Sequence, residues 1–180
     1  HEIKKDYNLI VRGLSSSMKV NSENDGMSLD DILTILKSSL DASLPKGKRL
    51  SFNIQLEENL YTQNHYLLLS IFRNLFNNAI EATNGNLVEL SVRQSSTDSS
   101  YVIEVEDHGP GIDPEDMEQI FEPGFSTKIN YETGEVNRGL GLSLVKDFIE
   151  FRLGGTIRVT SVPGKTVFTL TIPKEKWSGL

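Results

Sequence analysis

The sequence predicts an α+β fold, built as a two-layer α/β sandwich with a mixed sheet and helices on one face. Three observations lead to this prediction. Residues 50–56 alternate apolar and polar side chains, as a half-buried strand does. Residues 66–83 carry apolar side chains at helical spacing over several turns, and the predicted core face of this helix consists of Leu68, Phe72, Leu75, Ala79 and Ala82. Strands near 156–161 and 167–172 flank a Pro-Gly turn, which predicts a hairpin.

The beginning of the chain predicts a small extension followed by the main domain. Residues 1–19 carry apolar residues at helical spacing and lead into a polar, glycine-containing linker. Ser28, with an acidic residue three positions later, has the pattern of a helix N-cap, and Pro45 marks where that helix must end. We therefore expect an extension over residues 1–26 and a domain over residues 27–180.

The second half of the chain predicts two further strands, a long loop and a helix. The strands lie near 87–93 and 101–107, and the helix spans 141–153 and ends at a Gly-Gly pair. Residues 113–138 between them are irregular and contain glycines. Loops of that length inside compact domains are usually functional or disordered, so we expect a mobile lid there.

Composition limits the classes of function. The chain has 180 residues with 37% hydrophobic and 24% charged residues, which suits one globular domain with a small extension. The net charge of −7 disfavours binding to nucleic acid. The absence of cysteine excludes disulfides and fits a reducing compartment. No apolar run reaches the ~18 residues of a membrane span, so we expect a cytoplasmic domain, with a membrane anchor elsewhere in a longer protein left open.

The long helix combines an apolar face with a polar stripe. Ser70, Asn74, Asn78 and Glu81 recur at spacings of four, four and three residues, which places them on one side of the helix. Carboxamide oxygens in such a stripe are suitable ligands for Mg²⁺, which prefers oxygen and keeps waters and substrate phosphates as its other ligands. A solvent-exposed stripe without a ligand explains the same pattern.

Asp107 ends an apolar strand and opens a glycine-rich segment. Alternation along 101–107 puts its carboxylate on the same face as the apolar residues of that strand. A buried carboxylate needs a hydrogen-bond partner, and the amino group of adenine is one candidate. Gly109 and Gly111 would allow the backbone to approach a ligand closely. The alternative is an exposed aspartate that simply begins a turn.

A second glycine-rich segment precedes the last helix. Gly139 and Gly141 stand just before the helix that begins near Leu142, where free N–H groups and the helix dipole favour a phosphate. Arg138 adds a guanidinium suited to phosphate oxygens. The segment is not a Walker A loop, because no Gly-Lys-Ser/Thr follows it. A glycine-rich helix entry without a ligand is the alternative.

Taken together, four segments resemble the motif boxes of sensor histidine kinases. Residues 74–78 resemble the N box, 107–112 the first glycine box, 121–128 the F box of the ATP lid, and 137–142 the second glycine box. The resemblance covers about residues 27–180, and the motifs look most like those of the branch that contains citrate, dicarboxylate and glutamine sensors and peptide quorum sensors. It implies the Bergerat ATP-binding fold of the superfamily that also contains DNA gyrase, MutL and a heat-shock chaperone.

The resemblance also implies roles for individual residues, with ATP and Mg²⁺ as cofactors. Asn78 is similar to the asparagine that bridges Mg²⁺, Asn74 to its partner one turn earlier, and Asp107 to the carboxylate that reads adenine. The glycine boxes lie beneath the base and beside the phosphates. The full set of ATP-binding residues implied in this way is Asn74, Asn78, Asp107, Gly109, Gly111, Ile112, Thr127, Lys128, Arg138, Gly139, Leu140, Gly141, Leu142 and Thr166.

The implied activity is transfer of the γ-phosphoryl group of Mg-ATP to a histidine on a separate dimerisation hairpin, and then to a response regulator receiver domain. The full-length protein is expected to be a homodimer. Asn74 occupies the position at which the gyrase, MutL and chaperone relatives have a water-activating glutamate, which disfavours rapid hydrolysis. An anti-sigma-type serine kinase and a non-enzymatic phosphotransfer scaffold are the alternatives.

Three positions depart from the family pattern or imitate it misleadingly. His108 stands where a small polar residue is usual, and Lys165 where a glycine is usual; we expect neither to contact the main ligands. His1 is similar to a phosphoacceptor, but such a histidine opens a helical hairpin much longer than the segment before Ser28. We expect the acceptor histidine on a segment outside this chain, with residues 1–19 as the end of the second hairpin helix.

Overall fold

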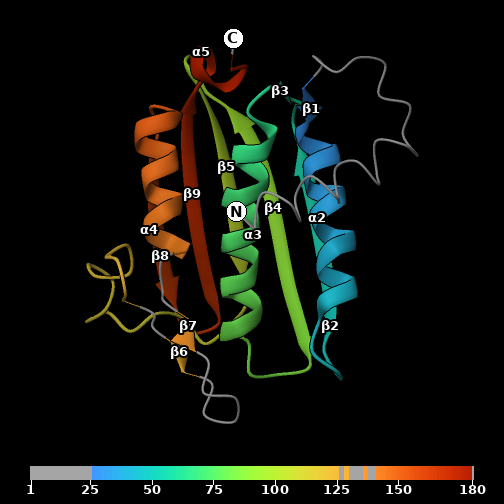
Figure 1. Cartoon of the computed structure of the whole chain (residues 1–180), viewed down its shortest axis with the longest axis vertical. Coiled ribbons are helices and arrows are strands. Elements are labelled where there is room, and N and C mark those ends of the chain that lie inside the picture. Colours follow the sequence, from blue (N-terminus) through green and yellow to red (C-terminus); the bar gives the residue numbers. More distant parts are fainter. Residues whose placement is uncertain (1–25, 126–127, 130–135, 138–140, 180) are drawn as a thin grey trace.

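The computed structural model describes residues 26–125, 128–129, 136–137 and 141–179, and Figure 1 shows that they form a sheet with helices in front of it. The sheet has five strands in the order β2-β4-β5-β9-β8. Strands β2 and β4 pair in parallel and all other neighbours pair antiparallel, so the sheet is mixed as predicted. The strands are β2 (Arg49–Leu56), β4 (Leu87–Ser96), β5 (Ser100–Asp107), β8 (Thr156–Val162) and β9 (Lys165–Pro173).

Three helical segments cover one face of this sheet, and the predicted fold class is confirmed (Figure 1). They are α2 (Leu29–Ser43), α3 (His65–Ala82) and α4 (Gly141–Asp147). The helix predicted over 141–153 is one continuous feature, but its second part is the π-helix η1 (Phe148–Arg152). It ends before Gly154, whose φ of +62° suits a residue without a side chain.

The local signals that start and bury the helices act as the sequence predicts. The side chain of Ser28 accepts a hydrogen bond from the backbone N–H of Asp31 at 3.1 Å, which caps α2. Helix α3 buries Phe72 and Phe76 against the sheet, and the ring of Phe52 from β2 meets the Phe76 ring edge-on at 5.1 Å. These aromatic contacts fix α3, the helix with the polar stripe, over the middle of the sheet.

Strand β5 has the predicted two faces. Ile103 and Val105 are 0% and 3% exposed beneath the helices, whereas Glu104 between them points to the uncovered face and pairs with Arg93. Asp107 continues the buried row and is itself only 8% exposed. The alternation of the strand therefore delivers a carboxylate to the helix-covered side of the sheet.

Several short elements were not predicted, because two to four residues carry no periodicity. Strands β1 (Met27–Ser28) and β3 (Tyr61–Thr62) pair with each other, and β6 (Lys128–Ile129) pairs with β7 (Val136–Asn137) inside the predicted loop. The C-terminal helix α5 (Lys174–Trp177) buries the Trp177 ring edge-on against Tyr101.

The extension predicted over residues 1–26 lies outside the described residues except for Gly26. Among the described helices, none combines the length and the apolar character needed to cross a membrane.

Candidate nucleotide site

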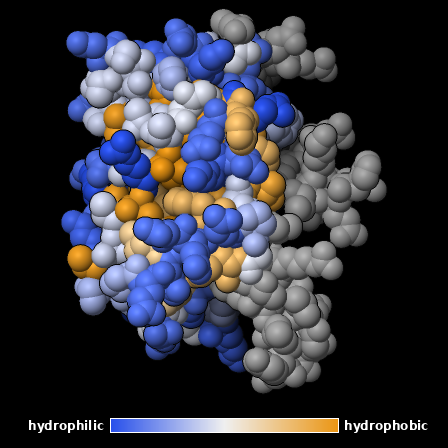
Figure 2. Space-filling model, turned by 90° about the vertical axis from the view of Figure 1, so that its left-hand side faces the viewer, coloured by the Kyte–Doolittle hydropathy of each residue, from blue (hydrophilic) through white to orange (hydrophobic). Residues whose placement is uncertain are grey.

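A cavity of about 280 Å³ lies between α3, the end of β5, the segment after β5 and the start of α4. Figure 2 shows the α4 side of the molecule, where hydrophobic side chains gather in the middle of a hydrophilic surface. The lining combines an apolar majority with a few polar groups, which is the usual composition of a small-molecule site. The lining residues are Asn78, Ala79, Ala82, Asp107, Gly111, Ile112, Asp113, Asp116, Ile120, Phe125, Leu142, Thr166 and Phe168.

Ala82 requires a correction. The helical spacing predicts it on the core face of α3, together with Ala79. Ala79 is buried, but Ala82 is exposed and lines the cavity. It is the last residue of α3, at the end of the helix that borders the open cavity.

Asp107 is the buried charge of the cavity. One oxygen of its carboxylate, Oδ1, accepts a hydrogen bond from the backbone N–H of Gly109 at 2.9 Å. Burial raises the pKa of Asp107 above its usual value, although the Gly109 N–H and the nearby His108 partly offset this effect. A carboxylate has a second oxygen with acceptor capacity of its own. That oxygen suits a ligand that brings its own N–H donor to this buried position.

Thr166 lies beside Asp107 on the neighbouring strand of the sheet. The two residues are directly paired between β5 and β9, so their side chains share one face. Thr166 is 4% exposed and lines the cavity, and its place beside a nucleotide base stays a prediction.

The next residue in this polar row is Ser161, which the sequence motifs did not reveal. It pairs with Thr166 between β8 and β9, and the two hydroxyl oxygens lie 2.7 Å apart. The Pro-Gly turn was the available signal. A two-residue turn at 163–164 sets 162 opposite 165 and therefore 161 opposite 166.

The first glycine segment is held against this hairpin. The N–H of Ile112 donates to Ser161 Oγ at 2.8 Å, and the N–H of Gly164 donates to the carbonyl of Gly109 at 3.1 Å. Gly111 has φ of +89°, and a Cβ at this position would lie 2.7 Å from the carbonyl oxygen of Val162. The backbone at Gly111 therefore approaches the hairpin closely, and the predicted close approach to a ligand stays a prediction.

The two asparagines predicted for the site, Asn74 and Asn78 of α3, face different neighbours. Asn78 is partly buried and lines the cavity. Asn74 lies one turn earlier and donates from Nδ2 to the carbonyl of Ser70 at 2.8 Å. A Cβ built on Gly141 would lie 3.0 Å from Asn74 Oδ1, so this amide sits against the first turn of α4 and not in the cavity lining.

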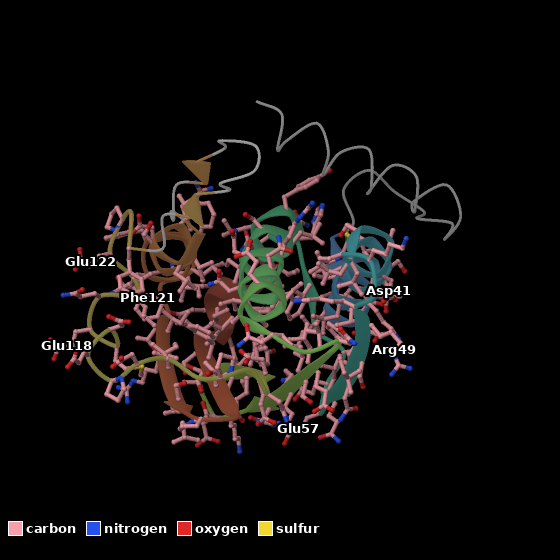
Figure 3. The ribbon with its side chains drawn as sticks, turned by 90° about the horizontal axis from the view of Figure 1, so that it is seen from below. Asp41, Arg49, Glu57, Glu118, Phe121 and Glu122 are labelled. Carbon is pink, nitrogen blue, oxygen red and sulfur yellow. The ribbon has the colours of Figure 1, made fainter. Side chains whose placement is uncertain are left out.

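The segment after β5 forms the apolar wall of the site. Ile120 is buried, and the ring of Phe121 meets the ring of Phe168 edge-on with centroids 6.4 Å apart. In Figure 3 Phe121 lies on the inner side of this segment, whereas Glu118 and Glu122 point outward. This wall is anchored to the sheet by aromatic packing, although its sequence has no regular periodicity.

The structure brings six of the fourteen predicted site residues together at the cavity. Asn78, Asp107, Gly111, Leu142 and Thr166 meet at the cavity together with Ile112. Gly109 adjoins it through its bond to the carboxylate, and Gly141 lies at the entry of α4. Lys128 is described only through the backbone pairing of β6. The predicted residues outside the described part of the chain are Thr127, Arg138, Gly139 and Leu140.

His108 and Lys165, the two residues that depart from the family pattern, both contact Glu106 on the face of the sheet that the helices do not cover. His108 Nε2 lies 3.0 Å from one oxygen of Glu106, and Lys165 Nζ lies 3.6 Å from the other. Arg93 adds a third contact at 3.2 Å. Burial alone would raise the pKa of Glu106, but the hydrogen bonds from His108 and Arg93 and the charges of Arg93 and Lys165 outweigh it and hold that pKa below its usual value.

Comparison with known proteins gives consistent matches to one family and one fold. Residues 64–176 match the family described as histidine kinase-, DNA gyrase B-, and HSP90-like ATPase. The chain is 33% identical to the sensor histidine kinase GlnK of Bacillus subtilis over 96% of this chain and 42% of that protein. It is 42% identical to the sensor protein CitS of Bacillus subtilis over 62% of this chain and 20% of that protein. The nucleotide-free catalytic domain of histidine kinase ThkA superposes with a TM-score of 0.68 at 27% identity, over 83% of this chain and 96% of that one.

Since the match to this family covers more than half of its residues, the chain belongs to the histidine kinase-, DNA gyrase B- and HSP90-like ATPase family. The resemblance stated from the sequence motifs is confirmed, and family membership implies an ATP-binding domain. The chain spans less than half the length of GlnK and of CitS, so those relatives have segments beyond the matched part.

Proposed function

We propose that this chain is the ATP-binding catalytic domain of a two-component sensor histidine kinase. The observation that carries the proposal is a buried carboxylate, Asp107, at a cavity to which α3 contributes Asn78, in a chain of the ATPase family. The full-length protein would transfer the γ-phosphoryl group of ATP to a histidine on its own dimerisation hairpin. A response regulator receiver domain would then take the phosphoryl group from that histidine.

The cavity suits an adenine base. Apolar side chains such as Ile112 and Phe168 line it and would contact the faces of a flat ring. Asp107 accepts from Gly109 through one oxygen, and its other oxygen would accept from the exocyclic amino group of adenine. A buried carboxylate with a raised pKa gains most from such a donor, because the donor replaces the lost hydration.

The chemistry of the donor set also suits Mg²⁺. In the described part of the chain, no group of three or more His, Cys, Asp or Glu residues could hold a metal ion. Mg²⁺ does not require such a cage, because it usually takes one or two protein oxygens and completes its octahedral shell with water and phosphates. Asn78 would supply the protein oxygen and Asn74, one turn earlier, would support it. When bound, Mg²⁺ would neutralise phosphate charge.

The contribution of this chain to phosphoryl transfer is positioning. Asp107 and Thr166 would fix the base, and Asn78 with the N-terminus of α4 would face the phosphates. The γ-phosphorus would bond to a histidine nitrogen from the hairpin while its bond to the bridging oxygen breaks, and ADP would leave. Asn74 is a poor base and is hydrogen-bonded to Ser70, so it would not activate water for hydrolysis.

The test has a binding stage and a transfer stage. Titration with ATP, with and without Mg²⁺, is expected to show saturable binding that Asp107→Asn weakens. Incubation with γ-labelled ATP and the dimerisation hairpin as a separate chain is expected to place acid-labile label on a hairpin histidine. Acid-stable label on a serine would favour the serine kinase alternative, and a wild-type chain that binds no ATP would favour the non-enzymatic scaffold.

A further inference from the structure

Ser161 does not line the cavity, yet it contacts two groups that do. Its Oγ accepts the N–H of Ile112 at 2.8 Å and lies 2.7 Å from Thr166 Oγ1. Thr166 is 4% exposed and stands directly opposite Asp107 in the sheet. Ser161, Thr166 and Asp107 therefore form one polar row across β8, β9 and β5, on the face that the helices cover.

The number of hydroxyl protons in this row determines whether the cavity presents a hydrogen-bond donor to a ligand. Each hydroxyl has one proton to donate. When Ser161 accepts from Ile112 and donates to Thr166, each of the two hydroxyls accepts one hydrogen bond and has one proton to donate, which is the cooperative arrangement. The proton of Thr166 is then left for the cavity that Thr166 lines.

We propose that Ser161 is a positioning residue that sets the choice of nucleobase, by orienting the Thr166 hydroxyl as a donor beside the Asp107 acceptor. Adenine presents an amino donor next to the N1 acceptor and matches this pair, directly or through one water. Guanine presents a carbonyl acceptor next to an N–H donor and opposes both groups. The inference rests on the proposed function, because it assigns a specificity determinant within the proposed nucleotide site.

A purely structural role for Ser161 predicts something different. Its bond to Ile112 also ties the first glycine segment to the hairpin, and the loss of that tie alone would weaken all purine nucleotides by the same factor. The ratio of ATP affinity to GTP affinity separates the two roles, because only the orientation of Thr166 discriminates between the bases.

The experiment measures the dissociation constants of ATP and GTP for the wild-type chain, Ser161→Ala, Ser161→Thr and the control Thr160→Ala. Thr160 is the exposed neighbour on the same strand. We expect Ser161→Ala to lower the ATP-to-GTP affinity ratio roughly five- to tenfold, the effect of losing one oriented hydrogen bond. Ser161→Thr keeps the hydroxyl and should keep the ratio, as should Thr160→Ala. Ser161→Cys, a weak hydrogen-bonding group of similar size, replaces the alanine variant if that variant does not fold.

The outcomes separate this inference from the proposed function. An unchanged ratio in Ser161→Ala or Ser161→Cys overturns the inference, even if both affinities fall together. Loss of the ratio in Ser161→Thr overturns it as well. A wild-type chain that binds neither nucleotide overturns the proposed function itself, and the wild-type titration shows this before any variant is measured.

Discussion

Two glycines with the same backbone conformation allow a matched test of how the hairpin packs on the first glycine segment. Gly111 and Gly164 both have φ of +89°. Alanine at either position therefore meets similar backbone strain, about 1–2 kcal/mol. A Cβ on Gly164 would have nothing within 4 Å, whereas a Cβ on Gly111 would lie 2.7 Å from the carbonyl oxygen of Val162 and 3.2 Å from Ser161 Oγ.

The backbone atoms next to Gly111 cannot move away without moving the whole β8–β9 hairpin. The backbone of Val162 belongs to β8, and the hairpin is tied to the glycine segment by the Ile112 and Gly164 hydrogen bonds. An added methyl group must push the two apart, at the cost of overpacking, about 1–3 kcal/mol. The entropic gain from removing a glycine in the unfolded chain is similar at both positions and cancels in the comparison.

We therefore expect Gly111→Ala to lower the free energy of unfolding by about 1–3 kcal/mol more than Gly164→Ala does. Urea denaturation followed by fluorescence of Trp177, the single tryptophan and only 2% exposed, measures both values. ATP affinity should fall only in Gly111→Ala, since the displaced segment carries the backbone beside Asp107. Equal losses of stability in the two variants would refute the close approach seen in the structure.

Three further predictions concern charge and metal. Asn78→Ala should abolish the Mg²⁺-dependent part of ATP affinity, measured by titration with and without the metal; a retained Mg²⁺ effect contradicts the role of Asn78. ATP affinity should fall as the pH is lowered through the raised pKa of Asp107, because the protonated carboxyl no longer accepts at both oxygens; a profile in Asp107→Asn that matches the wild type counts against this. The lowered pKa of Glu106 means that its stabilising contribution is present above the unfolded-state pKa and is lost as the pH falls through the folded-state pKa. Glu106→Gln should thus cost roughly 1 kcal/mol near neutral pH and little in acid, as urea denaturation at several pH values would show.

The fold was predictable from the sequence wherever a segment was long enough to show a period. The alternation in β2 and β5 and the helical spacing in α3 each extend over about seven residues or more, so their boundaries differ from the predicted ones by at most two residues at either end. The same alternation correctly predicts that Asp107 lies on the buried face of β5. Elements of two to four residues, such as β1, β3 and α5, are held by tertiary contacts and leave no local signal.

The features of the site that the sequence did not predict depend on pairing between distant strands or on hydrogen bonds of side chains to the backbone of their own helix. Ser161 is opposite Thr166 by the geometry of one turn, but its relevance requires that β9 also pair with β5, which no local pattern encodes. Asn74 shares a helix stripe with Asn78, yet its amide bonds the carbonyl one turn back, as polar side chains in helices often do. Spacing therefore predicts the correct face for both asparagines but not the direction of each amide.

His108 and Lys165, which depart from the family pattern, leave the nucleotide site intact because they lie on the opposite face of the sheet. Glu106 and Asp107 are adjacent in β5 and point to opposite sides of the sheet. Glu106 gathers Arg93, His108 and Lys165 on the uncovered face, whereas Asp107 meets Thr166 and the cavity on the covered face. Substitutions in the cluster around Glu106 should therefore change the stability of the domain and the pH dependence of that stability. The ratio of ATP affinity to GTP affinity should depend instead on Asp107, Thr166 and Ser161. A variant such as Glu106→Gln that changed this ratio would show that the two faces are coupled through β5.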